Sequence, residues 1–446
     1  MIKNTTIVSL ATPPMNGAIH IIRISGDDTY KIINKLTDKN IRKESYIIQH
    51  TNIVENKNII DNVLLMKFVA PKSFTGEDLI EINCHGGIFL ANKIISLLIK
   101  NGAKLAEKGE FSKRAFMNKK ISLNQAHAIN NLINSTNEKG IEFAHNGLND
   151  KTNKKLEEFI NTLFLLIGQI EVNIDYPEYD DVPAINKKQF IQKLNEINKT
   201  LLQLISSSKQ HMKYVEGFNI AILGKPNVGK SSLLNVLLQE EKAIVSSTPG
   251  TTRDVVEGRI NINGLTFNII DTAGIRSKTC NKIEKIGINN AIKNIDKADI
   301  ILFVIDGNKK IDEEDKKILS LIKNKTYIIV SNKADLKQVK NNLSIISVSA
   351  KNKKITSLLN AIKNKARTLN VKSTNTPLLQ SSAAIGYIEQ AQGKVNESLA
   401  SVRNGVSFDL IIQGLHDAYE DLLKVLGKNA DYEFINEMFK KFCLGK

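Results

Sequence analysis

Apolar and polar positions alternate differently in successive parts of the chain. Over residues 1–118, short alternating runs such as GAIHIIRIS and DLIEINCHGG predict strands. The run IFLANKIISLLIKNG instead repeats its apolar residues at three and four, which predicts a helix ending at Gly102. We therefore expect residues 1–118 to form an α+β domain.

From residue 119 to 215 the apolar period becomes helical. KKQFIQKLNEINKTLLQLISSS has the spacing of one face of a helical bundle. The acidic stretch DYPEYDDVP, residues 175–183, predicts a loop between two long helices. Residues 372–446 return to helical periodicity after the linker-like VKSTNTP. We expect residues 119–215 and 372–446 to be the first and second parts of one helical domain.

Residues 216–371 have a different pattern, with short apolar runs separated in several places by helical stretches. The runs are FNIAILG, LTFNIID, ADIILFVIDG, TYIIVSNKAD and LSIISVSA. This alternation is typical of a mostly parallel, doubly wound sheet. Because insertion is tolerated where a domain's termini lie close together, we expect this α/β unit to be inserted into the helical domain.

The first of these runs leads into GKPNVGKS, residues 224–231, which matches the P-loop pattern G-x-x-x-x-G-K-[ST]. Its glycines allow backbone amides to surround phosphates, Lys230 is placed to reach β- and γ-oxygens, and the Ser231 hydroxyl is placed to bind Mg²⁺. NKAD, residues 332–335, supplies the Asp335 carboxylate, which can accept both guanine N1–H and N2–H. SVSAK, residues 347–351, offers amides to guanine O6. The set predicts GTP rather than ATP.

Two further motifs, STPGTTRD and DTAG, lie between the P-loop and NKAD. Thr252 is expected to complete Mg²⁺ coordination, Asp271 to hold the metal through water, and the Gly274 amide to contact the γ-phosphate. The predicted GTP-contacting residues are Asn227, Val228, Gly229, Lys230, Ser231, Ser232, Ser246, Ser247, Thr248, Pro249, Gly250, Thr251, Thr252, Asp271, Thr272, Ala273, Gly274, Asn332, Lys333, Ala334, Asp335, Ser349, Ala350 and Lys351.

Ile275 follows DTAG, at the position where Ras-type GTPases place a glutamine that orients the attacking water. Because isoleucine cannot orient water, the charge and orientation needed for hydrolysis must come from elsewhere. Arg253 and Arg276 are candidate arginines. Alternatively, Asn227 and oxygens of the SSTPGT loop can surround a monovalent cation in the place of an arginine finger.

Composition adds a basic surplus, with 62 Lys and Arg against 46 Asp and Glu and a net charge of +16. This charge suits RNA, although the coding bias of an AT-rich genome would produce the same lysine excess. Cys84, Cys280 and Cys443 lack the spacing of a disulfide scaffold or zinc site. The N-terminus has no signal-peptide pattern and no apolar run reaches about 20 residues, so we expect a cytoplasmic protein without a membrane segment.

Over its whole length the chain resembles the MnmE (TrmE) family, tRNA uridine-modification GTPases of bacteria and organelles. The matching segments are ATPP, IIRISG, SFTGEDLIEINCHGG, GEFSKRAFMNKKISLNQAHAI, the four G motifs and the terminal FCLGK. Long matches in the same order in all three regions are more specific than the G motifs alone. The N-terminal region is thereby expected to be a folate-binding-like domain, and the inserted unit a Ras-like G domain.

For the G domain, the resemblance implies a homodimer whose GTPase activity depends on K⁺. The K⁺ ligands would be Asn227, Ser246, Thr248 and Thr251, while Ser231 and Thr252 bind Mg²⁺. The same resemblance implies that Glu284 is the catalytic residue that orients water. Considered without the family, Glu284 is an ordinary solvated helix charge.

For the N-terminal domain, the resemblance implies 5-formyltetrahydrofolate or a related tetrahydrofolate, bound by Arg23, Glu81, Lys120 and Lys446. Cations suit the glutamate tail of a folate, and a carboxylate suits the amidine edge of the pterin. Considered singly, each of these residues is more simply a surface ion. Cys443, near this site in sequence, is either a reactive thiol or an inert one.

The function implied is GTP hydrolysis in modification of C5 of the tRNA wobble uridine, U34. The FAD-dependent partner MnmG (GidA) would join the chain in a heterotetramer that adds aminomethyl or carboxymethylaminomethyl groups. Two alternatives stay open at this point. One is a ribosome-assembly GTPase of the Era/Der type, and the other is a folate-dependent one-carbon transferase with a regulatory G domain.

Overall fold

The computed structural model describes residues 5–149, 151–175, 185–240, 256–262, 264–270, 295–337, 339, 344–368, 377–428, 439 and 445. The chain divides into two compact units. The first holds residues 1–130, 147–201 and 386–446, and the second holds residues 131–146 and 202–385. The predicted domain boundaries at 118, 215 and 371 stay predictions.

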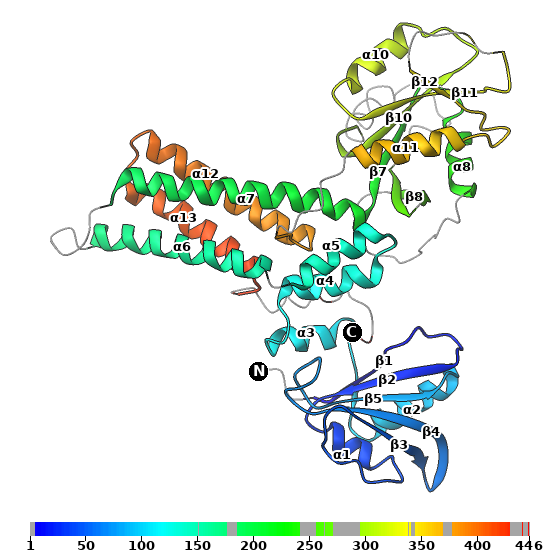
Figure 1. Cartoon of the computed structure of the whole chain (residues 1–446), viewed down its shortest axis with the longest axis vertical. Coiled ribbons are helices and arrows are strands. Elements are labelled where there is room, and N and C mark those ends of the chain that lie inside the picture. The colour runs from blue at the N-terminus through cyan, green and yellow to red at the C-terminus, as the bar shows by residue number, and fades with distance from the viewer. Residues whose placement is uncertain are drawn as a thin grey trace, which may run out of the picture. The chain divides into compact units, whose positions relative to one another are not determined.

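A six-stranded sheet with helices organises the first part of the chain (Figure 1). The strand order is β3-β4-β5-β2-β1-β6; β1 and β6 run parallel and the other neighbours antiparallel. In β2, His20, Ile22 and Ile24 are buried while Arg23 alternates with them, as the period of a strand requires. The elements are β1 (Ile7–Leu10), β2 (Ile19–Ser25), α1 (Thr29–Asn34), β3 (Ile47–Glu55), β4 (Asn58–Phe68), β5 (Leu79–His85), α2 (Ile88–Lys100), β6 (Lys104–Leu105) and α3 (Glu110–Met117).

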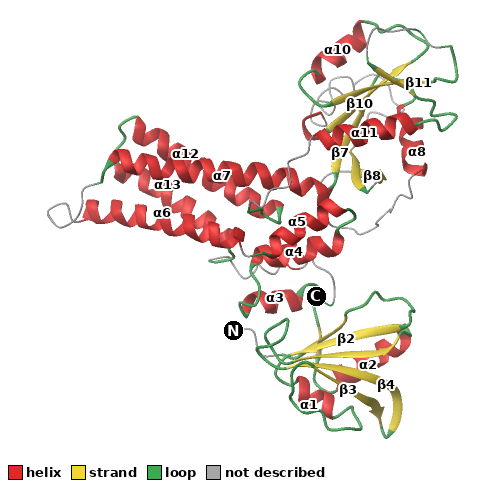
Figure 2. Cartoon of the chain, viewed as in Figure 1, coloured by secondary structure: helices red, strands yellow, loops and turns green. Residues whose placement is uncertain are grey.

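Long helices, drawn in red in Figure 2, form a further part of the chain, and in sequence they lie before and after a second sheet. They are α4 (Leu123–Asn134), α5 (Glu138–Leu148), α6 (Lys151–Asp175), α7 (Lys187–Glu216), α12 (Ser382–Arg403) and α13 (Phe408–Val425). Phe164 of α6 packs on Tyr419 of α13, with ring centroids 6.0 Å apart. Arg403 of α12 donates to Asn195 of α7 at 2.9 Å. Helices that precede the second sheet in sequence thus pack against helices that follow it. The α/β domain is therefore an insertion into one helical bundle.

The inserted domain contains a second six-stranded sheet, in the order β12-β11-β10-β7-β9-β8. Of the described strands in this sheet, only β8 runs antiparallel to its neighbour. The sequence predicted the five parallel strands but not β8, because Gly258 and Arg259 interrupt its apolar run. The elements are β7 (Phe218–Leu223), α8 (Lys230–Glu240), β8 (Val256–Ile262), β9 (Leu265–Ile270), β10 (Ile300–Asp306), α10 (Glu313–Ile322), β11 (Tyr327–Asn332), β12 (Ile345–Ser347) and α11 (Thr356–Thr368).

The central strands of this sheet are buried on both faces, which explains their continuous apolar sequence. Residues from Ile300 to Val304 in β10 are each 0% exposed. Among the described helices of the whole chain, none has the length and apolar content needed to cross a membrane.

Candidate guanine-nucleotide and folate sites

The parallel strands of the second sheet bring its polar motifs to one edge. β7 leads into the P-loop, β10 ends at Asp306, and β11 ends at Asn332, the first residue of NKAD. Asp306 and Asn332 are paired in register, and β7 runs parallel on the other side of β10. The carboxyl edge of such a sheet is where ligands bind in doubly wound folds.

The P-loop backbone adopts conformations that few residue types tolerate. Gly224, Asn227 and Gly229 have φ values of +148°, +64° and +95°. A Cβ added to Gly229 would lie 2.2 Å from Asn332 Nδ2, so the motif glycine allows NKAD to approach the loop. Such a turn directs successive amides toward an anion, and the N-terminus of α8 adds a positive dipole. Ser231 and Ser232 lie in the first turn of α8.

Lys230 is held by carbonyl groups of the P-loop itself. Its Nζ donates to the oxygens of Gly224 at 2.7 Å and Lys225 at 2.6 Å. Burial lowers the pKa of the Lys230 ammonium because the charged form loses water contact. An ammonium has three donors. With two of them engaged by described residues, the third is suited to a phosphate oxygen.

The base-recognition motifs are connected through Asn332, which is 3% exposed. Its Nδ2 donates to Val228 O at 3.0 Å, and its Oδ1 accepts from Ala350 N at 3.1 Å. One side chain therefore joins the P-loop, NKAD and SVSAK segments.

Asp335 is exposed and already oriented for a base. Ser349 Oγ donates to Asp335 Oδ1 at 2.6 Å, and this hydrogen bond lowers the pKa of the Asp335 carboxyl. The ionised carboxylate is an acceptor for the two N–H groups of guanine. Ala334 N donates to Val348 O at 3.0 Å, which aligns the two loops, and Lys351 is exposed beside them.

Sequence reasoning missed a second acidic residue at this edge, Asp306. Lys333 adopts a φ of +66° and its Nζ lies 2.7 Å from Asp306 Oδ2. Burial by itself raises the pKa of Asp306, but hydrogen bonds from Lys333 and Asn308 reverse this and lower it. An acidic residue at the end of a buried strand was the available signal.

In the N-terminal sheet, the structure brings two of the predicted folate residues together. Arg23 Nη2 lies 2.6 Å from Glu81 Oε1, on adjacent strands β2 and β5. The guanidinium lies 5.9 Å from the Phe74 ring centroid and 5.6 Å from that of Phe111. Its Nη1 donates to Gly445 O at 2.9 Å, which brings the end of the chain to this site.

Lys120, the third described folate candidate, lies at the loop that also carries Phe74. Its Nζ donates to Pro71 O at 2.9 Å, and its stem lies close to Gly76. Sequence reasoning missed Phe74, Phe111 and Gly445, because contacts between segments so far apart carry no local pattern.

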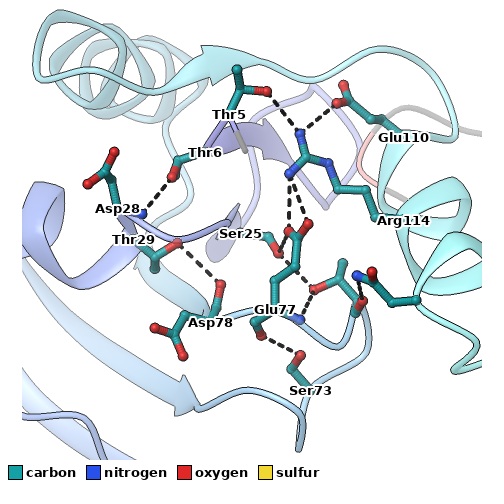
Figure 3. A network of polar contacts seen from close by, with 12 residues as sticks. Thr5, Thr6, Ser25, Asp28, Thr29, Ser73, Glu77, Asp78, Glu110 and Arg114 are labelled. Atoms are coloured by element: carbon teal, nitrogen blue, oxygen red, sulfur yellow. Dashed lines mark hydrogen bonds and ion pairs between the residues drawn. The ribbon is translucent and has the colours of Figure 1, made fainter. Parts of the chain in front are cut away.

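A network of polar contacts holds the same loop, residues 69–78 (Figure 3). Arg114 of α3, 4% exposed, donates to both carboxylate oxygens of Glu77 at 3.1 Å and to Glu110 at 2.9 Å. Glu77 also accepts from Ser25 Oγ at 2.9 Å, and Ser25 lies two residues after Arg23, at the end of β2. A buried charge flanked by partners in this way holds α3, the loop and β2 together.

Several predicted site residues lie outside the described part of the chain. They are Ser246, Ser247, Thr248, Pro249, Gly250, Thr251, Thr252, Asp271, Thr272, Ala273, Gly274, Glu284 and Lys446. The alternative arginines Arg253 and Arg276, and Cys443, are also outside it. Their predicted roles stay predictions.

Comparisons with known proteins cover the whole chain. The family model described as "GTP-binding protein TrmE N-terminus" matches residues 6–120, and the "MnmE helical domain" model matches residues 123–443. A tRNA modification GTPase MnmE from Malacoplasma penetrans is 48% identical over 99% of this chain and 100% of its own length. The protein of the same name from Mycoplasmoides gallisepticum is 46% identical over 100% of this chain and 99% of its own.

One solved structure, that of Aquifex aeolicus Era bound to GDP.AlF4-, is 29% identical over 40% of this chain and 67% of that chain. Its TM-score is 0.26, so this likeness adds nothing to the assignment.

The P-loop, NKAD and SVSAK segments at one edge of a doubly wound sheet define a GTP-binding protein with a Ras-like G domain. Similarity to the relatives identifies one family within this class of GTP-binding proteins. The chain belongs to the MnmE (TrmE) family of tRNA modification GTPases.

Proposed function

We propose that this chain is the GTP-hydrolysing component of a system that modifies C5 of the wobble uridine, U34, in tRNA. The observation that supports this most strongly is 48% identity to a tRNA modification GTPase over 99% of the chain. The modification would add an aminomethyl or carboxymethylaminomethyl group, together with the FAD-dependent partner MnmG. A homodimer of this chain would join that partner in a heterotetramer, in the cytoplasm.

In the G domain, we assign Mg²⁺ to Ser231 and Thr252, and K⁺ to Asn227, Ser246, Thr248 and Thr251. Both ions would supply positive charge to the phosphates as negative charge develops in the transition state. The described residues fit this assignment. Ser231 is the second residue of α8, and Asn227 is exposed at a left-handed position of the P-loop. Glu284 would orient the water in place of the missing glutamine.

In the N-terminal domain, a reduced folate such as 5-formyltetrahydrofolate fits the Arg23–Glu81 site. Since Arg23 Nη2 and Glu81 Oε1 lie 2.6 Å apart, both side chains would contact the same end of the ligand. Both hydrogen bonds that Arg23 donates to Glu81 go to Oε1, so Oε2 is suited to accept from the pterin amidine edge. Lys120 and Lys446 would then hold the glutamate tail.

Nucleoside mass spectrometry of tRNA tests this function. Cells lacking the gene should lose the modified wobble uridines, and the wild-type gene should restore them. A gene carrying Lys230→Ala should not restore them, because the ammonium that contacts the phosphates is absent.

Unchanged wobble nucleosides in the deletion strain would overturn the proposal. If immature ribosomal particles accumulated instead, the protein would be an assembly GTPase. If purified Lys230→Ala protein still turned over folate at the wild-type rate, the G domain would be regulatory only.

A further inference from the structure

The second residue of the P-loop, Lys225, makes contacts that the nucleotide site itself does not require. Its Nζ lies 2.5 Å from Asp312 Oδ2 and 2.9 Å from Asp315 Oδ2. Both carboxylates belong to the start of helix α10, which follows strand β10 along the chain (Figure 1). The ion pairs therefore connect the P-loop to an element 87 residues further along the chain.

Asp312 and Asp315 already form the capping box of α10. Asp312 Oδ1 accepts from the backbone N–H of Glu314 and Asp315, and Asp315 Oδ2 accepts from the N–H of Asp312. The Lys225 ammonium thus contacts a helix start whose own geometry is fixed. Because these backbone hydrogen bonds orient both carboxylates, the helix start can hold the lysine in one position.

The ion pairs of Lys225 with Asp312 and Asp315 are partly shielded from water. Lys225 and Asp315 side chains are 17% and 4% exposed, although Asp312 is 58% exposed. Asp315 Oδ1 is buried without a hydrogen-bond partner among the described residues. Loss of the lysine would leave the buried Asp315 carboxylate without its cation, which would destabilise this contact between α10 and the P-loop.

Lys225 also reaches the phosphate-binding lysine through its backbone. The Lys225 carbonyl accepts from Lys230 Nζ at 2.6 Å. A connected path therefore runs from the α10 capping box to the Lys225 side chain, then to its carbonyl, and then to the ammonium expected on the phosphates.

The β10–α10 loop, residues 307–312, contacts the base-recognition side as well. Gly307 N donates to Asn332 O at 3.0 Å, and Lys333 pairs with Asp306, immediately before this loop. The loop thus lies between the residues that bind phosphate and those that bind guanine.

We propose that Lys225 is a positioning residue that fixes the P-loop for guanine nucleotide by its ion pairs with Asp312 and Asp315. This inference rests on the proposed GTPase function and adds a residue to it. Lys225 acts through its own carbonyl on Lys230, without contact to the nucleotide. Its loss loosens the loop and speeds nucleotide release, while a nucleotide that stays bound is hydrolysed at nearly the normal rate.

The test measures release of fluorescent mant-GDP and steady-state GTP hydrolysis with the full-length protein. Lys225→Met should speed mant-GDP release by about five- to tenfold and raise KM, with kcat changed by less than about twofold. Lys225→Arg should restore near wild-type release because the positive charge is retained. Lys316→Met is the matched control, since Lys316 pairs with Glu313 on the exposed side of the same helix.

A second variant separates positioning from direct contact with the nucleotide. Asp312→Asn with Asp315→Asn removes both negative charges, while asparagine still caps a helix well. This double variant should speed release as Lys225→Met does, and combining all three substitutions should add little more.

Wild-type release rates in Lys225→Met would overturn the inference, and so would a strictly additive effect of the aspartate substitutions. Failure of the wild-type protein to bind mant-GDP would instead overturn the proposed GTPase function. The two outcomes are therefore distinguishable.

Discussion

At the scale of single residues, close backbone approaches decide where this chain tolerates change. Gly229 illustrates this, because its φ of +95° and its distance from Asn332 both exclude a Cβ. Gly168 in α6 has nothing within 4 Å of an added Cβ. Replacing glycine by alanine should therefore be harmful at position 229 and tolerated at position 168.

Gly229→Ala should weaken mant-GDP binding by at least about tenfold, since a left-handed alanine costs about 1–2 kcal/mol before the clash with Asn332 is added. Gly168→Ala should leave binding unchanged and slightly stabilise α6. Fluorescence titration measures both. Equal affinities for Gly229→Ala and wild type would contradict this interpretation of the P-loop.

The proposed catalytic residue provides a second residue-scale prediction. Glu284→Ala should lower kcat for GTP by about 10²–10³-fold, because one transition-state contact is removed. GTP affinity should stay close to wild type. Single-turnover kinetics and nucleotide titration separate the two quantities. An unchanged kcat would mean that another residue orients the attacking water.

The proposed monovalent cation site can be tested through Asn227. Replacing K⁺ by Na⁺ should lower the GTPase rate of the wild-type protein by at least about tenfold. In Asn227→Ala the rate should be low and insensitive to the salt. If wild type hydrolysed GTP equally fast in both salts, the cation would have no role.

At the scale of elements, α7 is attached to the second sheet by a buried junction. Asn268 of β9 donates to the carbonyl of Glu216, the last residue of α7, at 2.9 Å. Lys213 of α7 forms an ion pair with Asp299 next to β10, and Tyr214 belongs to the hydrophobic core of the sheet. Since β7 continues from α7 to the P-loop, helix and nucleotide site are joined through one strand.

Asn268→Ala should lower the free energy of unfolding of this unit by about 1–2 kcal/mol, because the Glu216 carbonyl loses its donor. Chemical denaturation in the presence and absence of GDP identifies the relevant transition, since a ligand stabilises the unit that binds it. The control Asn404→Ala, at an exposed position after α12, should not change this transition. Equal shifts for both variants would argue against the junction.

At the scale of the whole molecule, the end of the chain packs against its first third. Phe439, 1% exposed, shares a small core with Phe116, Leu123 and Ala126. The Phe116 and Phe439 ring centroids are 6.2 Å apart. Gly445 then meets Arg23 in the candidate folate site. Phe439 thus belongs to a core of the first unit, and Gly445 to its candidate folate site.

Phe439→Ala should destabilise the first unit by about 3–5 kcal/mol, as expected for a fully buried aromatic side chain. It should also weaken binding of 5-formyltetrahydrofolate, since it releases the segment that reaches Arg23. Phe89→Ala, at a position that is 83% exposed, is the control and should change stability by less than about 0.5 kcal/mol. Denaturation and folate titration measure the two effects, and wild-type behaviour of Phe439→Ala would contradict this role of the C-terminus.

The sequence alone determined the parallel strands and the nucleotide class, because both depend on local patterns. Continuous apolar runs mark strands buried on both faces, and the phosphate and guanine motifs are short segments whose backbone chemistry is self-contained. The sequence did not predict strand β8, because Gly258 and Arg259 interrupt its apolar pattern.

Only the tertiary structure decided the contacts between distant segments. The pairing of Lys225 with Asp312 and Asp315, and that of Arg23 with Glu81 and Gly445, depends on which side chains the fold brings within a few ångströms. Charged residues are common along this chain, and no local pattern distinguishes a partner from a solvated neighbour. Burial and distance make that distinction, and both are properties of the folded chain.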